Sequence, residues 1–175
     1  MKDKTLTTEP TIIEALRNES LRIEEDTEHS AKRHFNTCDL WSMLHYALGI
    51  PATILAAAAS TALVKNDHGW AQLMGLAVAL FAALMTFLKP SDRASQHRAV
   101  GNQYLALRND ARMFREIDLA EAIDDSKKSE RLRRLAQRRN DLNSSAPSTP
   151  RWAFEKTRQG IAEGETTYRR TAQPT

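Results

Sequence analysis

The sequence has very little cysteine and few aromatic residues. Its 175 residues include one cysteine, Cys38, and only 6% aromatic side chains. A single cysteine excludes an intramolecular disulfide and a cysteine-based metal cluster within one chain. There is also no Ser-His-Asp ordering and no phosphate-binding loop, and the histidines at 29, 34, 45, 68 and 97 are scattered. We therefore expect no enzymatic activity, no catalytic residue, no metal site and no cofactor.

Charge is missing from two long runs. Residues 40–64 and 69–88 contain no Lys, Arg, Asp or Glu, although these residue types make up 27% of the sequence. About 20 apolar residues in a helix cross a hydrocarbon core of ~30 Å, so both runs are predicted to be transmembrane helices. The first run begins too late for a secretory signal peptide. The alternative, a buried hairpin in a soluble protein, is disfavoured because a chain this short has little protein to cover both runs.

The gap between the runs is a turn. Residues 65–68 read Lys-Asn-Asp-His, and Gly69 follows them; Asn, Asp and Gly are turn residues. Helices joined by so short a loop must be antiparallel, which leaves both termini on one side. Basic residues are more numerous beyond the outer ends of the runs than at the tip, and the positive-inside rule then places both termini in the cytoplasm. The basic residues at the outer ends are Lys32, Arg33, Lys89, Arg93 and Arg98.

Amphipathic patterns flank the two runs. His97, Val100, Tyr104, Leu107, Ala111 and Phe114 recur every three or four residues, as on one face of a helix. Residues 1–39 carry a net charge of −3 and residues 89–175 a net charge of +6, so the two ends should attract each other. The predicted fold class is an all-α membrane protein, a transmembrane helical hairpin with long amphipathic cytoplasmic helices before and after it. Its expected parts are a flexible N-terminus (1–9), a cytoplasmic helix (10–37), transmembrane helices (40–64 and 69–88), further cytoplasmic helices (91–143), a docking helix (150–165) and a disordered tail (166–175).

Small and polar side chains form a stripe along each apolar run. In lipid, small residues allow helices to approach closely, so the stripes mark contacts within the hairpin or between protomers. Alternatively, one stripe lines a water-filled path in an oligomer, with His45 as a gate or lining residue. Pro51 removes one backbone hydrogen bond, and with Gly49 it could form a hinge. The stripe residues are Ser42, His45, Gly49, Ala52, Ala56 and Ser60 in the first run, and Gln72, Gly75, Ala79, Ala83 and Thr86 in the second.

A basic run stands near the C-terminal end of the chain. The segment 131–139 reads RLRRLAQRR, and its candidate lipid- or ligand-contacting residues are Arg131, Arg133, Arg134, Arg138 and Arg139. Such a run could hold anionic lipid or a nucleotide phosphate, or it could be a solvated helix face. Aromatic side chains that would stack on bases are missing from it, so no direct nucleic acid binding is expected.

Three segments resemble the SLATT family of small two-span membrane proteins. They are HSAKRHFNTCDLWSMLHYALGIPATILAAAAS, FLKPSDRASQHRAVGNQYLALRNDAR and APSTPRWAFEKTRQGI. The second segment is the most specific, with Leu88-Lys89-Pro90-Ser91, His97, Gly101 and Tyr104 resembling the family pattern. The resemblance covers residues 10–165 as one SLATT-like domain.

The resemblance implies an oligomeric, pore-forming effector of anti-phage defence. Such a protein would sit in the bacterial inner membrane, with the loop 65–68 outside, and would permeabilise the membrane in abortive infection. The family is associated with nucleotide-signal synthetases, SLOG proteins and reverse transcriptases encoded nearby, which are therefore the expected partners besides membrane lipid and further copies of the chain. A nucleotide second messenger is the candidate activator. The alternative function is a passive membrane anchor or scaffold that recruits a soluble partner through its cytoplasmic helices.

Overall fold

The computed structural model describes residues 11–65 and 67–163, and every regular element within them is helical. The predictions for residues 1–9 and 166–175, and for Asn66 at the turn, lie outside the described residues. The all-α class is therefore confirmed for the described part of the chain. The elements are α1 (Ile12–Val64), α2 (His68–Leu88), α3 (Pro90–Met113), the π-helical turn η1 (Phe114–Asp118), α4 (Asp125–Ser145) and α5 (Arg151–Ala162).

Helix α1 is a single helix of 53 residues. It begins at a capping box, in which the Thr11 side chain accepts from the Glu14 backbone N–H and the Glu14 side chain accepts from the Thr11 N–H. The sequence predicts separate helices over 10–37 and 40–64, but the structure has one continuous helix there, because residues 37–40 contain neither Pro nor Gly. Pro51 lies within the helix. One rigid rod of about 80 Å therefore connects the charged and the apolar parts of the chain.

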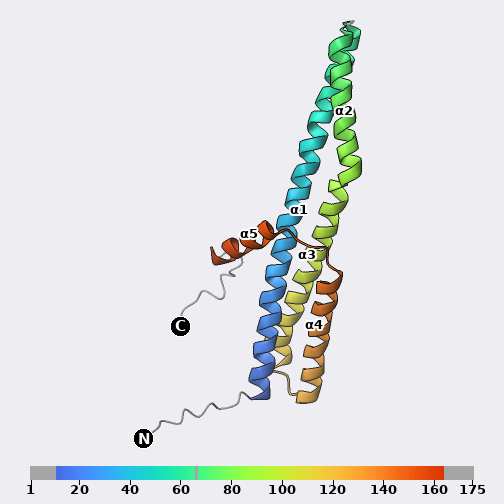
Figure 1. The fold of residues 1–175 in the computed structure, drawn as a ribbon. Coiled ribbons are helices and arrows are strands. Elements are labelled where there is room, and N and C mark those ends of the chain that lie inside the picture. Colours follow the sequence, from blue (N-terminus) through green and yellow to red (C-terminus); the bar gives the residue numbers. More distant parts are fainter. Residues whose placement is uncertain (1–10, 66, 164–175) are drawn as a thin grey trace.

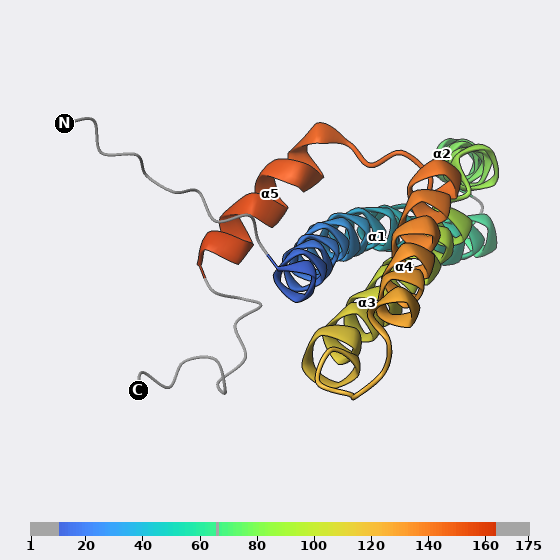
Figure 2. The same cartoon turned by 90° about the horizontal axis from the view of Figure 1, so that it is seen from below.

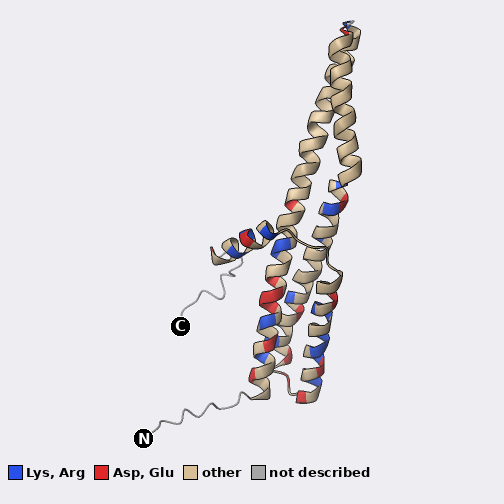
Figure 3. Cartoon of the chain, in the orientation of Figure 1, with Lys and Arg blue, Asp and Glu red and all other residues tan. Residues whose placement is uncertain are grey.

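The molecule has two regions along this rod. In the first, which we call the apolar pair, the charge-free half of α1 lies beside α2 (Figure 1). In the second, the charged bundle, the N-terminal half of α1 packs with α3 and α4. Figure 3 shows that Lys, Arg, Asp and Glu are gathered in the bundle and α5, apart from a few at the far tip of the apolar pair. Figure 2 shows α5 on one side of α1 and α3 on the other.

The core of the charged bundle lies where α1, α3 and α4 meet. The predicted apolar face of α3 is confirmed, because Tyr104, Leu107 and Ala111 are at most 2% exposed and His97 is buried with them. Helix α1 comes close to this face at Gly101, where an added Cβ would lie 2.9 Å from Cε1 of Phe35. The remaining large core residues are Leu16, Ile23, Phe114, Leu119, Leu132 and Leu142.

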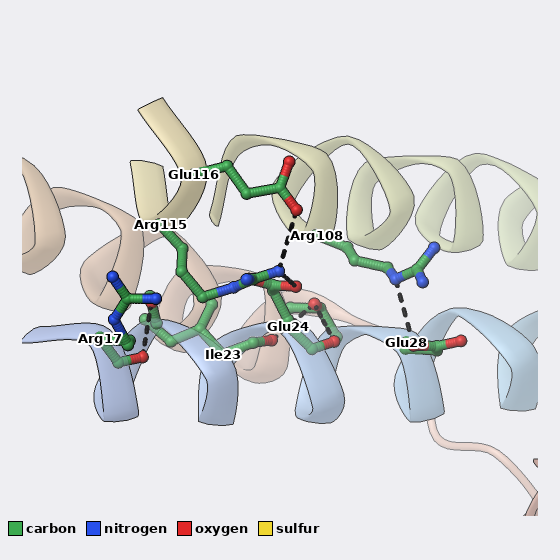
Figure 4. Close-up of polar contacts among 9 residues, drawn as sticks. Arg17, Ile23, Glu24, Glu28, Arg108, Arg115 and Glu116 are labelled. Atoms are coloured by element: carbon green, nitrogen blue, oxygen red, sulfur yellow. Dashed lines mark hydrogen bonds and ion pairs between the residues drawn. The ribbon is translucent and has the colours of Figure 1, made fainter. Parts of the chain in front are cut away.

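Ion pairs join α1 to the basic helices across the bundle. The Glu24 carboxylate accepts from Nε of Arg115 at 2.7 Å, and Nε of Arg108 lies 3.2 Å from Glu28 (Figure 4). A third pair joins Asp26 of α1 to Arg139 of α4 at 3.7 Å. The attraction expected between the acidic N-terminal part and the basic C-terminal part is thus confirmed. These pairs lie between the helices of the bundle, beside its buried apolar core.

Candidate functional site

The apolar pair is the first candidate functional region, because the rest of the described chain leaves it uncovered. Helix α1 and the helical segment that begins with α2 each contain an 18-residue window long and apolar enough to cross a membrane, and only 6% of each window is buried. An apolar helix in the core of a soluble protein would be mostly buried. The fold therefore defines an all-helical protein with two uncovered apolar helices of membrane-spanning length.

The first predicted stripe divides between two environments. Its inner part, from Ser42 to Ala52, is partly buried against α2, and a Cβ added at Gly49 would lie 3.8 Å from Sδ of Met85. Its outer part is exposed, and the Ser60 hydroxyl donates to the carbonyl of Ala56 at 3.0 Å. The inner part thus makes the contact between the two helices, while the outer part faces away from it.

The second predicted stripe faces away from α1 along its whole length. Gln72, Gly75, Ala79, Ala83 and Thr86 are all exposed, and a Cβ added at Gly75 would meet nothing within 4 Å. Within the described chain this stripe has no helix packed on it. The side chains of α2 that are buried or partly buried form another face, made of Ala71, Met74, Ala77, Val78, Phe81, Met85 and Leu88.

His45 is the one strongly polar ring in the charge-free half of α1. Its Nδ1 is buried and has no hydrogen-bond partner among the described residues. The ring lies edge-on to Tyr46, with 5.6 Å between centroids, beside a shallow cavity of about 350 Å³ that Gly49 and Thr53 also line. A buried ring nitrogen without a partner is costly. A partner from another copy of the chain, or water, would satisfy it.

A histidine pair connects the two long helices at the top of the charged bundle. Nδ1 of His34 in α1 lies 2.9 Å from Nδ1 of His97 in α3, and the His34 ring stacks on Tyr104. One ring must donate and the other accept, so the bond requires that at most one of them is charged. Burial first, then the positive charges of His97 and Arg33, lowers the pKa of His34 from 6.5 to about 4. The pair is therefore a neutral link between α1 and α3 near neutral pH.

The predicted basic run lies on α4, where most of its arginines are paired. Arg131 lies 3.2 Å from Asp118, and Arg138 donates to Asp110 at 2.7 Å. Arg134 pairs with Glu130 on its own helix at 3.2 Å. Arg139 pairs with Asp26, as described above, and Arg133 is exposed. A ligand at this run would have to compete with carboxylates of the same chain.

The positions of Lys89 and Arg93 in the sequence predict the orientation of the chain but not where these two side chains lie. Both line a cleft between the apolar pair and the charged bundle, and the Arg93 guanidinium lies 4.7 Å from the centre of the Trp41 ring. The available signal was the spacing itself, since two cations stand within the five residues that follow Leu88. Trp41, which the Arg93 guanidinium contacts, is too far away in the sequence to be assigned by spacing.

Comparisons with family models, with curated proteins and with solved structures give no match to this chain. Among residues 11–65 and 67–163, no group of three or more His, Cys, Asp or Glu side chains is arranged to hold a metal ion. The function proposed next therefore rests on the two regions and on the residues that line them.

Proposed function

We propose that the chain is an oligomeric membrane effector of the SLATT kind, which permeabilises the bacterial inner membrane in anti-phage defence. The apolar pair would cross the bilayer as a helical hairpin, and the charged bundle would lie in the cytoplasm with both termini. The single observation that carries this proposal is the uncovered state of two long apolar helices beside a bundle with its own buried core. Water is a poor environment for so much apolar surface, and lipid is a good one.

An effector of this kind must act as an oligomer. Two helices cannot enclose a water-filled path, so several copies would have to surround it. The exposed stripe of α2, from Gln72 to Thr86, supports the proposal because small residues let a neighbouring helix approach closely. The unsatisfied Nδ1 of His45 supports it as well, because polar groups within a membrane usually face a bundle interior or a cavity.

The mass of the protein in detergent tests directly whether it forms an oligomer. Replacing Ala79 by Leu adds bulk to the exposed stripe of α2, and we expect the oligomer to dissociate or to shrink. Ala106→Leu is the matched control, because Ala106 is an exposed alanine in the charged bundle. Light scattering after size-exclusion chromatography measures the mass of both variants. An unchanged mass for Ala79→Leu would show that the stripe is not a contact between protomers.

The second candidate is a passive anchor that recruits a soluble partner. It is favoured by α5, which carries exposed aromatic side chains at Trp152 (37% exposed) and Phe154 (46% exposed). Exposed aromatic residues are common anchors in protein interfaces. Here the function of the apolar pair would be attachment alone, and the partner would be a nucleotide-signal synthetase, a SLOG protein or a reverse transcriptase.

Dye release from vesicles separates the two functions. The purified protein is reconstituted into vesicles loaded with a self-quenching dye, and membrane insertion is verified by flotation. An effector should release the dye, and Ala79→Leu should reduce the release. If the protein floats with vesicles that stay sealed, also after addition of candidate nucleotide messengers, the effector proposal fails and the anchor remains.

A further inference from the structure

A cleft lies where the apolar pair joins the charged bundle. Its volume is about 710 Å³, within the range of small-ligand sites. One wall comes from α1 at Trp41, and another from the end of α2 and the first turns of α3. The third wall is the connection 147–150 between α4 and α5, which crosses the other helices at this level (Figure 1). The cleft therefore joins segments that are far apart in the sequence.

The polar side of the cleft is suited to an anion. Lys89 and Arg93 line it, and neither forms an ion pair with any described residue. The Arg93 guanidinium lies over Trp41 at 4.7 Å, which holds the charge in place and leaves the edge of the guanidinium for hydrogen bonds. Asp92 also lines the cleft, so the two cations outnumber the one carboxylate there.

The carbonyl end of α2 meets the N–H end of α3 at this point. Lys89 has φ 46° and ψ 53°, which ends α2 and starts α3 at Pro90. The start of α3 has no side-chain capping hydrogen bond. The first N–H groups of a helix lack helical acceptors, and the helix dipole is positive there. Because the negative end of the α2 dipole lies at the same place, the two helix ends offset each other, and the attraction for an anion comes from the Lys89 and Arg93 side chains.

The other side of the cleft is apolar and continues into the apolar pair. Leu40, Phe87 and Leu88 line it together with Trp41 and Trp152. Phe87 is 84% exposed and Leu40 is 43% exposed, so part of this apolar surface has no cover from the chain itself. A free phosphate would leave these side chains in contact with water. A phosphate that carries acyl chains would cover them.

We propose that this cleft binds the headgroup of an anionic phospholipid, with the phosphate at Lys89 and Arg93 and the acyl chains along Phe87 and Leu40. Basic pockets on the cytoplasmic side of membrane helices hold such headgroups. The inference rests on the membrane location in the proposed function, but it does not require pore formation. Lipid in the cleft would contact the connection 147–150, which leads directly into α5.

Contact between a bound lipid and the connection 147–150 would affect α5, because this helix packs on α1. Helix α5 packs on α1 through a hydrogen bond from Asn36 to Thr157 at 3.0 Å, and through Arg33, which lies 5.7 Å from the centre of the Phe154 ring. The third wall of the cleft, the connection 147–150, leads directly into this docked helix. Bound lipid would therefore stabilise the docked position of α5.

Lipid retention in native mass spectrometry tests the site. The full chain is extracted from vesicles that contain equal amounts of phosphatidylglycerol and phosphatidylcholine, and the bound lipids are counted. We expect at least fivefold more phosphatidylglycerol, and we expect the double variant Lys89→Gln/Arg93→Gln to lose this preference. Arg17→Gln/Arg22→Gln is the control, because it removes the same charge from two exposed positions of α1 that do not line the cleft, and it should keep the preference. Equal retention of the two lipids, or equal loss in both variants, would overturn the site.

Two further measurements are needed. One distinguishes a lipid headgroup from a free phosphate compound, and the other distinguishes the lipid site from the pore-forming effector. Glycerol phosphate, added in excess, should displace little phosphatidylglycerol; full displacement would overturn the role of the acyl chains. Flotation of the same samples reports membrane insertion, and dye release reports pore activity. Sealed vesicles with retained phosphatidylglycerol would reject the effector and support the lipid site, whereas dye release without lipid preference would do the reverse.

Discussion

The apolar pair and the charged bundle solve the problem of helix packing in opposite ways. The bundle buries Leu107, Ala111 and Phe114 to 2% exposure or less and ties its helices with ion pairs, such as Arg115 with Glu24. The apolar pair leaves Leu73, Leu76 and Leu80 at least 58% exposed, and no ion pair is found along its charge-free length in the described chain. The helices of the bundle are therefore held together by contacts within the chain. The exposed apolar surface of the pair, in contrast, must be covered by a surrounding medium or by further copies of the chain.

A charge placed on the apolar pair should produce the largest effect. Leu80 is 61% exposed, and Leu80→Arg places a cation near the middle of α2. At the centre of a membrane helix an Arg costs about 3 kcal/mol, so we expect most of the protein to be lost from the carbonate-resistant membrane fraction. Met113→Arg, at an equally apolar and 53% exposed position in the bundle, should stay in that fraction. Equal membrane retention of the two variants would contradict the membrane location of the pair.

Acid should weaken the bundle rather than the pair. The pKa of His34 is lowered to about 4, so the unfolded chain takes up the proton before the folded protein does. The contribution of His34 to stability is therefore complete above about pH 6.5 and is lost as the pH falls toward 4, with a limit of about 3 kcal/mol. The pKa of His97 is lowered too, first by burial and then by Arg93, so it acts in the same direction.

Denaturant unfolding in a mild detergent, followed by circular dichroism between pH 7 and pH 4, measures this effect. His34→Gln should show a smaller loss of stability over this range than the unmodified protein. His29→Gln serves as the control, because His29 lies outside the histidine pair. If all three proteins lose the same free energy of unfolding, the histidine pair does not carry the pH dependence.

The third-largest difference between the two regions should come from replacing a glycine by a larger residue. A Cβ at Gly101 would lie 2.9 Å from the Phe35 ring, whereas a Cβ at Gly75 has no neighbour within 4 Å. Overpacking a tight contact costs about 1–3 kcal/mol, so Gly101→Leu should lower the free energy of unfolding of the bundle. Gly75→Leu should leave the free energy of unfolding of the bundle unchanged, although it should weaken the contact between protomers as Ala79→Leu does. Thermal unfolding of both variants in detergent provides the measurement, and equal midpoints would contradict the close approach of α1 and α3.

The smallest effect should come from removing single ion pairs. Arg115 and Glu24 are 21% and 13% exposed, whereas Arg151 and Glu155 on α5 are 93% and 63% exposed. Arg115→Met should cost about 1 kcal/mol, because its partner stays partly buried without a counter-charge. Arg151→Met should cost less than about 0.5 kcal/mol. Unfolding in urea resolves the difference, and a larger loss from Arg151→Met would show that burial does not set the strength of these pairs.

Much of the fold can be predicted from the sequence, because the helices and their apolar faces follow from local patterns of residues. The absence of charge over 40–64 and 69–88 predicts the two apolar helices, and the periodicity of residues 97–114 predicts the buried face of α3. Both predictions depend on neighbours within one helix. The unbroken length of α1 is not predicted by these patterns, because the composition changes near residue 38 while the helix continues through it.

The candidate site was less accessible, because it depends on pairs of distant residues. Spacing identified the stripe on α2, yet only the structure shows that Ala79 faces away from α1 while Met85 faces it. The sequence leaves open whether the arginines of α4 contact a ligand or form a solvated face, and only the structure shows that Arg138 meets Asp110. Neither fact can be read from one helix alone.

The sequence by itself determined where this protein is charged, where it is apolar and which side chains share a helix face. The tertiary structure decided which faces meet: His34 with His97, Gly101 with Phe35, and Arg93 with Trp41. The physical reason is that the two kinds of interaction act over different separations along the sequence. Helix formation and amphipathicity arise from residues three or four positions apart, whereas packing depends on the shape and charge of surfaces that the chain brings together only when it folds.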